Sequence, residues 1–119
     1  MLLISSEDEF QKLLSAERAI VFMTFDWSKQ AELSETVVEE WLRSWNIWHP
    51  KLEVPIYKIA PDEMPFIWEW LRRMPKEGGK GSLVWIKDGS VVDYEPFVAA
   101  AGIRDIAQRT TQAFSDSQS

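Results

Sequence analysis

The chain has 119 residues, of which 45% are hydrophobic and 27% charged, which is the length and composition of one globular domain and not of a disordered segment. Its net charge of −6 makes a nucleic acid or an anionic membrane an unfavourable partner, because both present negative charge. No basic segment followed by a long apolar run resembles a secretory leader, and no apolar run approaches the roughly 20 residues that span a bilayer, so we expect a cytoplasmic protein.

The N-terminal part predicts a strand, a helix and a second strand. Residues 2–4 are a short apolar run, and Ser6 with Glu9 forms a capping box that starts a helix over residues 7–16. Residues 19–25 form a continuous apolar run rich in β-formers. Such a run is typical of a central strand that is covered on both faces.

The middle of the chain predicts a long helix, a strand and a third helix. Ser28 or Asp26 can cap a helix from Gln30 to about residue 46, whose apolar residues recur at three- and four-residue steps. These apolar residues are Leu33, Val37, Val38, Trp41, Leu42 and Trp45. Residues 54–59 are typical of a second covered strand, and Pro61 opens a third helix.

The C-terminal part predicts a hairpin and a closing helix. Residues 83–86 and 91–94 are short apolar strands joined around an Asp-Gly turn. A helix follows over residues 99–114, and residues 115–119 form a polar tail that we expect to be disordered. The order β-α-β-α-β-α-β-β-α predicts a single α/β domain over residues 1–114, with a mixed central sheet flanked by helices.

The order of elements and several residues resemble the thioredoxin family. Residues 21–27 look like the strand that leads to that family's active-site tryptophan, with Trp27 in its place, and residues 83–89 look like its hairpin. The next four positions fall where thioredoxins carry Cys-Gly-Pro-Cys, and they are Ser28, Lys29, Gln30 and Ala31. The resemblance covers nearly the whole chain and implies a thioredoxin-like fold.

The departures from the family pattern concern its chemistry. The chain contains no cysteine, so it lacks the thiolates that dithiol exchange and glutathione chemistry require. Gly81 stands where the family has a cis-proline before the hairpin strand, and Phe22 stands where it has a buried acid that serves proton transfer to the thiols. The resemblance therefore implies the fold without its thiol–disulfide oxidoreductase activity.

No other catalytic or metal-binding constellation is visible in the sequence. A zinc site needs several Cys or His ligands, whereas His49 is the single histidine. The long helix separates His49 from Ser28, which disfavours a catalytic triad built on Ser28 or Ser82. The glycine-rich residues 77–82 precede a strand and not the helix that a phosphate loop needs. We therefore expect no metal and no cofactor.

The favoured hypothesis is a redox-inactive binding module that contacts an unknown protein or peptide through the groove of the thioredoxin fold. Seven residues would form this groove: Trp27, Ser28, Lys29, Gln30, Ala31, Gly81 and Ser82. An exposed Trp27 would anchor the partner, and the backbone at Gly81 and Ser82 would pair with an extended segment. The sequence leaves open whether Trp27 is exposed or packs over the start of the helix.

Two alternatives use other surfaces or other chemistry. A structural or oligomerisation subunit, such as a homodimer, would use residues 45–50 or the helix that carries Trp68 and Trp70. Those two tryptophans are separated by about 200° on a helix, so they cannot both face the core. An enzyme of unrelated chemistry on the same scaffold would need a deep pocket lined by convergent polar groups, and no motif indicates one.

Overall fold

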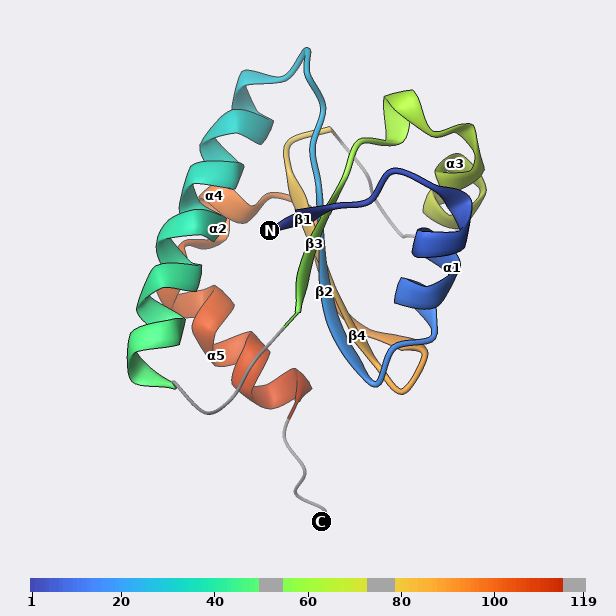
Figure 1. The fold of residues 1–119 in the computed structure, drawn as a ribbon. Coiled ribbons are helices and arrows are strands. Elements are labelled where there is room, and N and C mark those ends of the chain that lie inside the picture. Colours follow the sequence, from blue (N-terminus) through green and yellow to red (C-terminus); the bar gives the residue numbers. More distant parts are fainter. Residues whose placement is uncertain (50–54, 73–78, 115–119) are drawn as a thin grey trace.

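The computed structural model describes residues 1–49, 55–72 and 79–114, which form a five-stranded sheet with helices on both faces (Figure 1). The strands are β1 (Leu2–Leu3), β2 (Arg18–Met23), β3 (Ile56–Ile59), β4 (Ser82–Lys87) and β5 (Ser90–Glu95). The helices are α1 (Glu7–Leu14), α2 (Lys29–Trp48), α3 (Pro65–Leu71), α4 (Val98–Ala101) and α5 (Ile103–Ala113), with a 3₁₀ turn, η1 (Pro61–Glu63), before α3.

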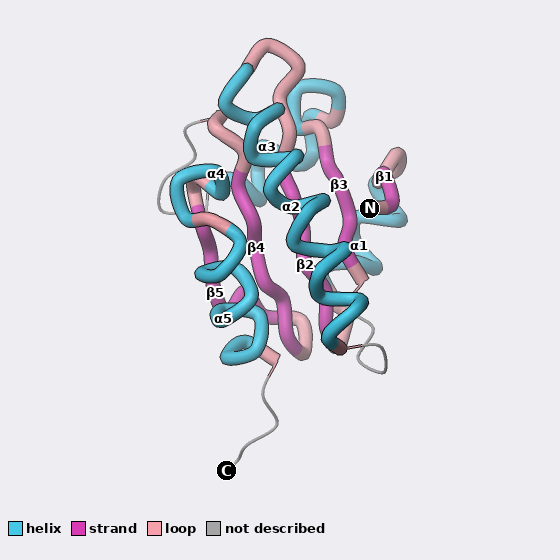
Figure 2. The backbone as a smooth tube through the Cα atoms, turned by 90° about the vertical axis from the view of Figure 1, so that its left-hand side faces the viewer, coloured by secondary structure: helices cyan, strands magenta, loops and turns pink. Residues whose placement is uncertain are grey.

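The strand order in the sheet is β1-β3-β2-β4-β5. The β1–β3 and β3–β2 pairs are parallel, whereas the β2–β4 and β4–β5 pairs are antiparallel. Helices α1 and α3 cover one face, and α2, α4 and α5 cover the other (Figures 1 and 2). The α/β architecture with a mixed central sheet, predicted from the order of the elements, is confirmed.

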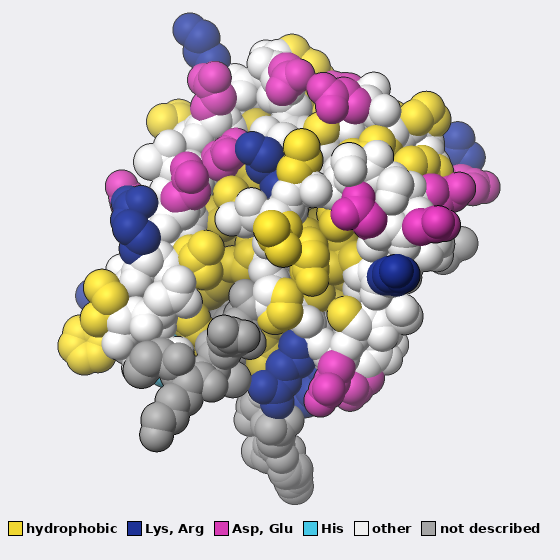
Figure 3. All heavy atoms as spheres, viewed as in Figure 1, with side chains coloured by type: hydrophobic (Ala, Val, Ile, Leu, Met, Phe, Trp, Pro, Cys, Tyr) yellow, Lys and Arg dark blue, Asp and Glu magenta, His cyan; other side chains and the backbone are white. Residues whose placement is uncertain are grey.

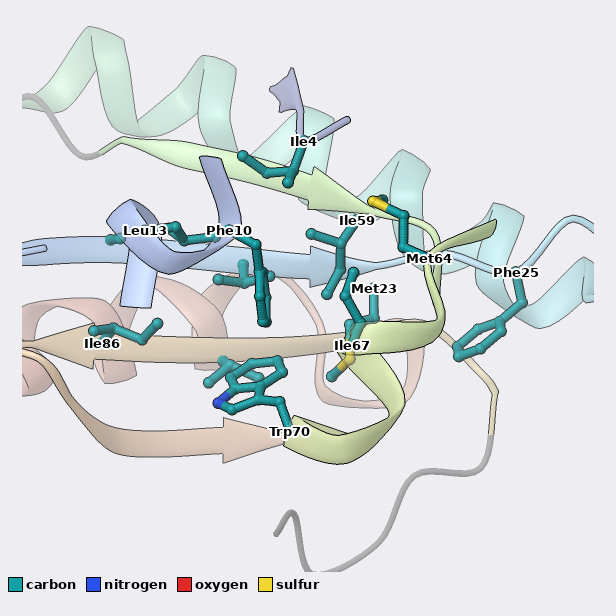
Figure 4. Close-up of a cluster of buried hydrophobic side chains, with 13 residues drawn as sticks. Ile4, Phe10, Leu13, Met23, Phe25, Ile59, Met64, Ile67, Trp70 and Ile86 are labelled. Atoms are coloured by element: carbon teal, nitrogen blue, oxygen red, sulfur yellow. The ribbon is translucent and has the colours of Figure 1, made fainter. Parts of the chain in front are cut away.

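Strand β2 lies at the centre of the molecule and separates two apolar cores. Ala19, Val21 and Met23 face α1 and α3, while Ile20 and Phe22 face α2 and α5, and none of the five is accessible to solvent. Figure 4 shows the first core, in which side chains of α1 and α3 pack on the sheet. The continuous apolar run in the sequence therefore reflects a strand that is buried on both faces.

Three helix predictions need correction. The helix expected from Pro61 is two elements, because Met64 precedes a proline and adopts extended backbone (φ −135°, ψ 90°), and α3 begins only at Pro65. The expected C-terminal helix is broken at Gly102, whose φ of 85° and ψ of 165° separate α4 from α5. Helix α2 continues to Trp48 and is longer than expected, since no glycine or proline interrupts it before that point.

The large apolar side chains follow the helical spacing, with one exception. Trp41 and Trp45, which belong to the predicted apolar stripe of α2, are buried, and so is Trp85 of β4. In α3, Trp70 is buried and Trp68 is 41% exposed, so the two face different ways as the spacing requires. Leu33 was expected in the apolar face of α2, but it is 61% exposed, because the buried face of this helix runs through Ala31, Ser34, Val38, Trp41 and Trp45, and Leu33 points well away from it.

The β4–β5 hairpin has the predicted turn and an irregular edge. Asp88 and Gly89 have φ values of 51° and 77°, the pair of positive angles that a type I′ turn requires. The register shifts between Trp85 and Ile86, which leaves Val92 without a partner in the ladder. Such a bulge on an edge strand disfavours pairing with a further strand.

Some predictions concern residues outside the described ranges. The start of the second covered strand at residue 54 and the polar tail over residues 115–119 are among them. Within the described ranges, no helix combines the length and the apolar composition needed to cross a membrane.

Arg109 of α5 joins the edge strand β5 to the rest of the fold. Its guanidinium donates to both carboxylate oxygens of Asp93 at 2.8 Å and to Glu95 at 2.6 Å. Its central carbon lies 5.0 Å from the ring centroid of Trp85, within the range of a cation–π contact. The hydrogen bonds that Arg109 donates to Asp93 hold the pKa of that carboxyl below its usual value, since they favour the charged carboxylate.

We expect the Arg109→Met variant to be less stable by about 2 kcal/mol at pH 7, because it leaves Asp93 and Glu95 without their partner. The Asp93 contribution is present above the carboxyl's unfolded-state pKa, near 3.8, and is lost as the pH falls through its lower folded-state value. The stability difference from wild type, measured by urea unfolding, should therefore shrink below about pH 4. A difference that is constant from pH 7 to pH 2.5 would contradict this assignment.

Trp85 and Trp41 form a matched pair for a second prediction. Both are buried, but Trp85 donates its indole N–H to Thr110 at 2.9 Å, whereas Trp41 Nε1 has no partner in the described part of the chain. We expect Trp85→Phe to lower the free energy of unfolding by about 2–3 kcal/mol and Trp41→Phe by about 1 kcal/mol or less, because the second variant also removes an unsatisfied donor. Equal losses in urea unfolding would show that the two indoles do not differ in this way.

Candidate binding surface at the start of α2

The N-terminus of α2 lies directly after the central strand, and Ser28 caps it. The Ser28 hydroxyl accepts the backbone N–H of Ala31 at 3.1 Å, and its own N–H donates to Phe25 O. Ser28 is only 6% exposed and Ala31 is fully buried. The two positions that resemble the redox cysteines of thioredoxins are therefore occupied by a helix cap and a packing residue.

Residues 79–81, which lead into β4 and are called the β4 segment below, pack directly on this helix. Gly81 has a φ of 90°, and a Cβ added there would overlap the side chain of Ser34 and crowd the backbone of Ala31. All peptide bonds in the described ranges are trans, including the bonds on either side of Gly81. The position that resembles the cis-proline of thioredoxins is thus a glycine in the left-handed region.

Ser34 fixes this junction, although it was not among the residues expected at the site. Its hydroxyl donates to Lys80 O at 2.7 Å and accepts the backbone N–H of Ala99 at 3.1 Å, which joins α2 to the β4 segment and to α4. Gly81 O in turn accepts Val98 N–H at 3.0 Å. The signal for Ser34 was its position three residues after Ala31, where a small polar side chain shares the buried face of the helix.

The backbone at Gly81 and Ser82 is engaged within the chain. Ser82 is opposite Met23 in the β2–β4 ladder, and β4 lies between β2 and β5, so Ser82 is not at a sheet edge. The Ser82 hydroxyl donates to Pro96 O at 3.3 Å. The expectation that these two residues offer an edge for strand pairing therefore needs correction, because other strands already flank β4 on both sides.

Trp27 is both exposed and held in place. The side chain is 66% exposed, and its indole N–H donates to Asp62 Oδ2 at 2.6 Å. Its ring lies 5.4 Å from the ring of Phe25, and a Cβ on Gly79 would overlap its far edge. Trp27 is thus presented to solvent in a defined orientation, which resolves the question that the sequence left open.

The structure brings the seven residues of the expected groove together, but they divide into two groups. Trp27, Lys29 and Gln30 are exposed. The other four are buried and form the support beneath them, and they are Ser28, Ala31, Gly81 and Ser82. Only the exposed group is accessible to solvent at this surface, and the buried group lies beneath it.

His49 lies far from this surface, and the described residues form no cluster of metal ligands. His49 lies at the opposite end of the 20-residue helix α2, about 30 Å from Ser28 by helix length, and stacks on Trp45 with ring centroids 4.1 Å apart. Within the described ranges, no three His, Cys, Asp or Glu residues are grouped so that they could hold a metal ion. Phe22 is buried at the position of the family's acid, beside Lys58 in the ladder.

Two glycines with positive φ allow the junction at Gly81 to be tested. Gly102 has a φ of 85° with no atom near an added Cβ, whereas a Cβ on Gly81 overlaps Ser34. We expect Gly102→Ala to cost about 1–3 kcal/mol from backbone strain alone. We expect Gly81→Ala to cost clearly more, because steric overlap adds to a similar strain. Equal losses of the free energy of unfolding, measured in urea, would mean that the β4 segment moves away from α2 without cost.

Comparison with known proteins gives a consistent result for the fold. No family model and no curated protein matches the sequence. The thioredoxin of Malassezia sympodialis is 19% identical, with a TM-score of 0.72 over 94% of this chain and 89% of that chain. The thioredoxin of Fasciola hepatica is 17% identical, with a TM-score of 0.70 over 95% of this chain and 99% of that chain.

A thioredoxin of Plasmodium falciparum is also 17% identical, with a TM-score of 0.70 over 91% of this chain and 95% of that chain. Identities this low establish the architecture and not a shared activity. The chain has the thioredoxin fold, and it contains no cysteine with which to carry out thiol–disulfide exchange.

Proposed function

We propose that the chain is a non-catalytic, redox-inactive binding module that holds a protein or peptide segment against Trp27. The observation that carries the proposal is the combination of exposure and restraint at this side chain. Trp27 is 66% exposed, yet its indole N–H is bonded to Asp62 at 2.6 Å. Tryptophan is among the residues that contribute most to protein interfaces.

The restraint on Trp27 favours binding because less side-chain freedom is lost when a partner arrives. Phe25 supports one part of the ring at 5.4 Å between centroids, and Gly79 leaves room for its far edge. The contact area extends toward Lys80, whose ammonium lies 5.4 Å from the ring centroid of Phe97. Because Lys80 O and Gly81 O are engaged internally, side-chain contacts supply the main part of the interaction in this proposal.

A second candidate function is supported by a different surface. Ile47 and Trp48, at the C-terminal end of α2, are 74% and 79% exposed. Exposed large apolar side chains that adjoin one another are a common feature of protein interfaces. In this alternative the chain is a structural or oligomerisation subunit that uses the Ile47–Trp48 surface, and Trp27 has no part in it.

A peptide selection distinguishes the two candidates. A random peptide library displayed on phage is selected on the wild-type chain, and single peptides are then measured on four variants, Trp27→Ala, Asp62→Ala, Trp48→Ala and Trp68→Ala. We expect Trp27→Ala to weaken the selected peptides by about 30-fold or more, because it removes the anchor. We expect Asp62→Ala to weaken them by a smaller factor, because it only frees the ring. Trp68→Ala, at a partly exposed tryptophan on α3, is the matched control and should bind as wild type does.

Each variant is first checked for an unchanged far-ultraviolet spectrum and unfolding midpoint. Peptides that bind equally well to wild type and Trp27→Ala would refute the main proposal. Peptides that depend on Trp48 instead, or a monomer–dimer equilibrium that Trp48→Ala abolishes in sedimentation, would favour the second candidate.

A further inference from the structure

A cavity of about 280 Å³ adjoins Trp27 on the flank away from Gly81. Its walls come from the ends of β2 and β3, from the first turns of α2 and from η1. In the sheet, β3 and β4 lie on opposite sides of β2. The cavity lies on the β3 side, because Lys58 and Ala60 line it, whereas the β4 segment lies on the other side. Phe25 belongs both to the cavity wall and to the support of the Trp27 ring, which makes the two features continuous.

The cavity has an apolar part and a strongly acidic rim. Leu3, Phe25 and Ala60 supply the apolar part. Asp26, Glu32, Glu35 and Glu63 supply four carboxylates, and Lys58 is the one cation among its lining residues.

Three of these carboxylates form no ion pair with the described residues. Lys58 is bonded to Glu35 at 2.9 Å, so these two charges largely neutralise one another. No ion pair joins Asp26, Glu32 or Glu63 to a lysine or arginine within the described part of the chain. In Figure 3, mainly acidic side chains gather over the upper end of the molecule, where Figure 1 places the loop after β2 and the start of α2.

We propose that this cavity receives a lysine or arginine side chain of the polypeptide that docks on Trp27, an inference that rests on the function proposed above. Lysine and arginine combine an apolar stem with a terminal cation, and the cavity offers an apolar wall below a rim of carboxylates. The stem lies along Phe25 and Ala60, and the cation meets Asp26 and Glu63. The partner is therefore a basic segment, and the net charge of −6 attracts it from a distance.

The experiment uses three forms of the chain as baits for the same random peptide library. The first is wild type, and the second is the Asp26→Asn/Glu63→Gln variant, which neutralises two carboxylates of the rim. The third is Glu39→Gln/Glu40→Gln, which removes the same charge from exposed positions further along α2 and serves as the matched control. Each pool is sequenced, and peptides that no longer bind Trp27→Ala are scored for lysine and arginine content against the unselected library.

We expect lysine and arginine to be enriched in the Trp27-dependent peptides from wild type and from the control, and not in those from the rim variant. A synthetic wild-type-selected peptide, titrated calorimetrically at low salt, should bind the rim variant about threefold to tenfold more weakly than the control. This difference should fall when the salt concentration is raised, because salt screens charge interactions at an exposed surface.

The possible failures are distinguishable. Trp27-dependent peptides without an excess of basic residues, or with the same excess on all three baits, would overturn the inference and leave the proposed binding function standing. The absence of any Trp27-dependent peptide would overturn both.

Discussion

Burial of β2 on both of its faces is the constraint on which the rest of the structure depends. Because Ala19, Val21 and Met23 fill one core and Ile20 and Phe22 the other, the strand fixes both helical layers relative to the sheet. The chain leaves this rigid strand at its C-terminal end and must turn at once into α2. The residues in that turn are therefore held by the two cores, although several of them are exposed. This is why a loop residue such as Trp27 can have a defined orientation.

The positions that resemble the chemical residues of thioredoxins are occupied in this chain by residues that cap a helix or pack in the interior. Ser28 caps α2, Ala31 is buried beneath the β4 segment, and Gly81 allows that segment to approach Ser34. Phe22 adds apolar surface to a core, and its ladder neighbour Lys58 pairs with Glu35 of α2. Burying an acid in this core would lower the stability of the fold, and without a thiol the acid would have no proton-transfer role. An apolar ring at Phe22 is therefore consistent with the absence of cysteine. The junction of α2 with the residues before β4 is held by packing and hydrogen bonds that need no sulfur chemistry.

Much of the candidate surface could be predicted from the sequence, but its decisive contacts could not. The position of Trp27 after a covered strand and the cap at Ser28 were both visible as local patterns. The bond from Trp27 to Asp62 joins residues 35 positions apart, and Ser34 reaches Lys80 over 46 positions. Such contacts depend on how strands are ordered in the sheet, which short-range spacing does not encode. The acidic cavity is of the same kind, since its carboxylates come from separate segments.

The sequence by itself determined the alternation of strands and helices, the apolar stripe of α2 that carries Trp41 and Trp45, and the absence of thiol chemistry. These follow from hydrophobic periodicity and from composition, which are local properties. Tertiary structure alone decided the break at Gly102, the exposure of Leu33 and the fixed presentation of Trp27. The physical reason is that burial is a property of the assembled layers, whereas periodicity reveals only which face of an element is apolar.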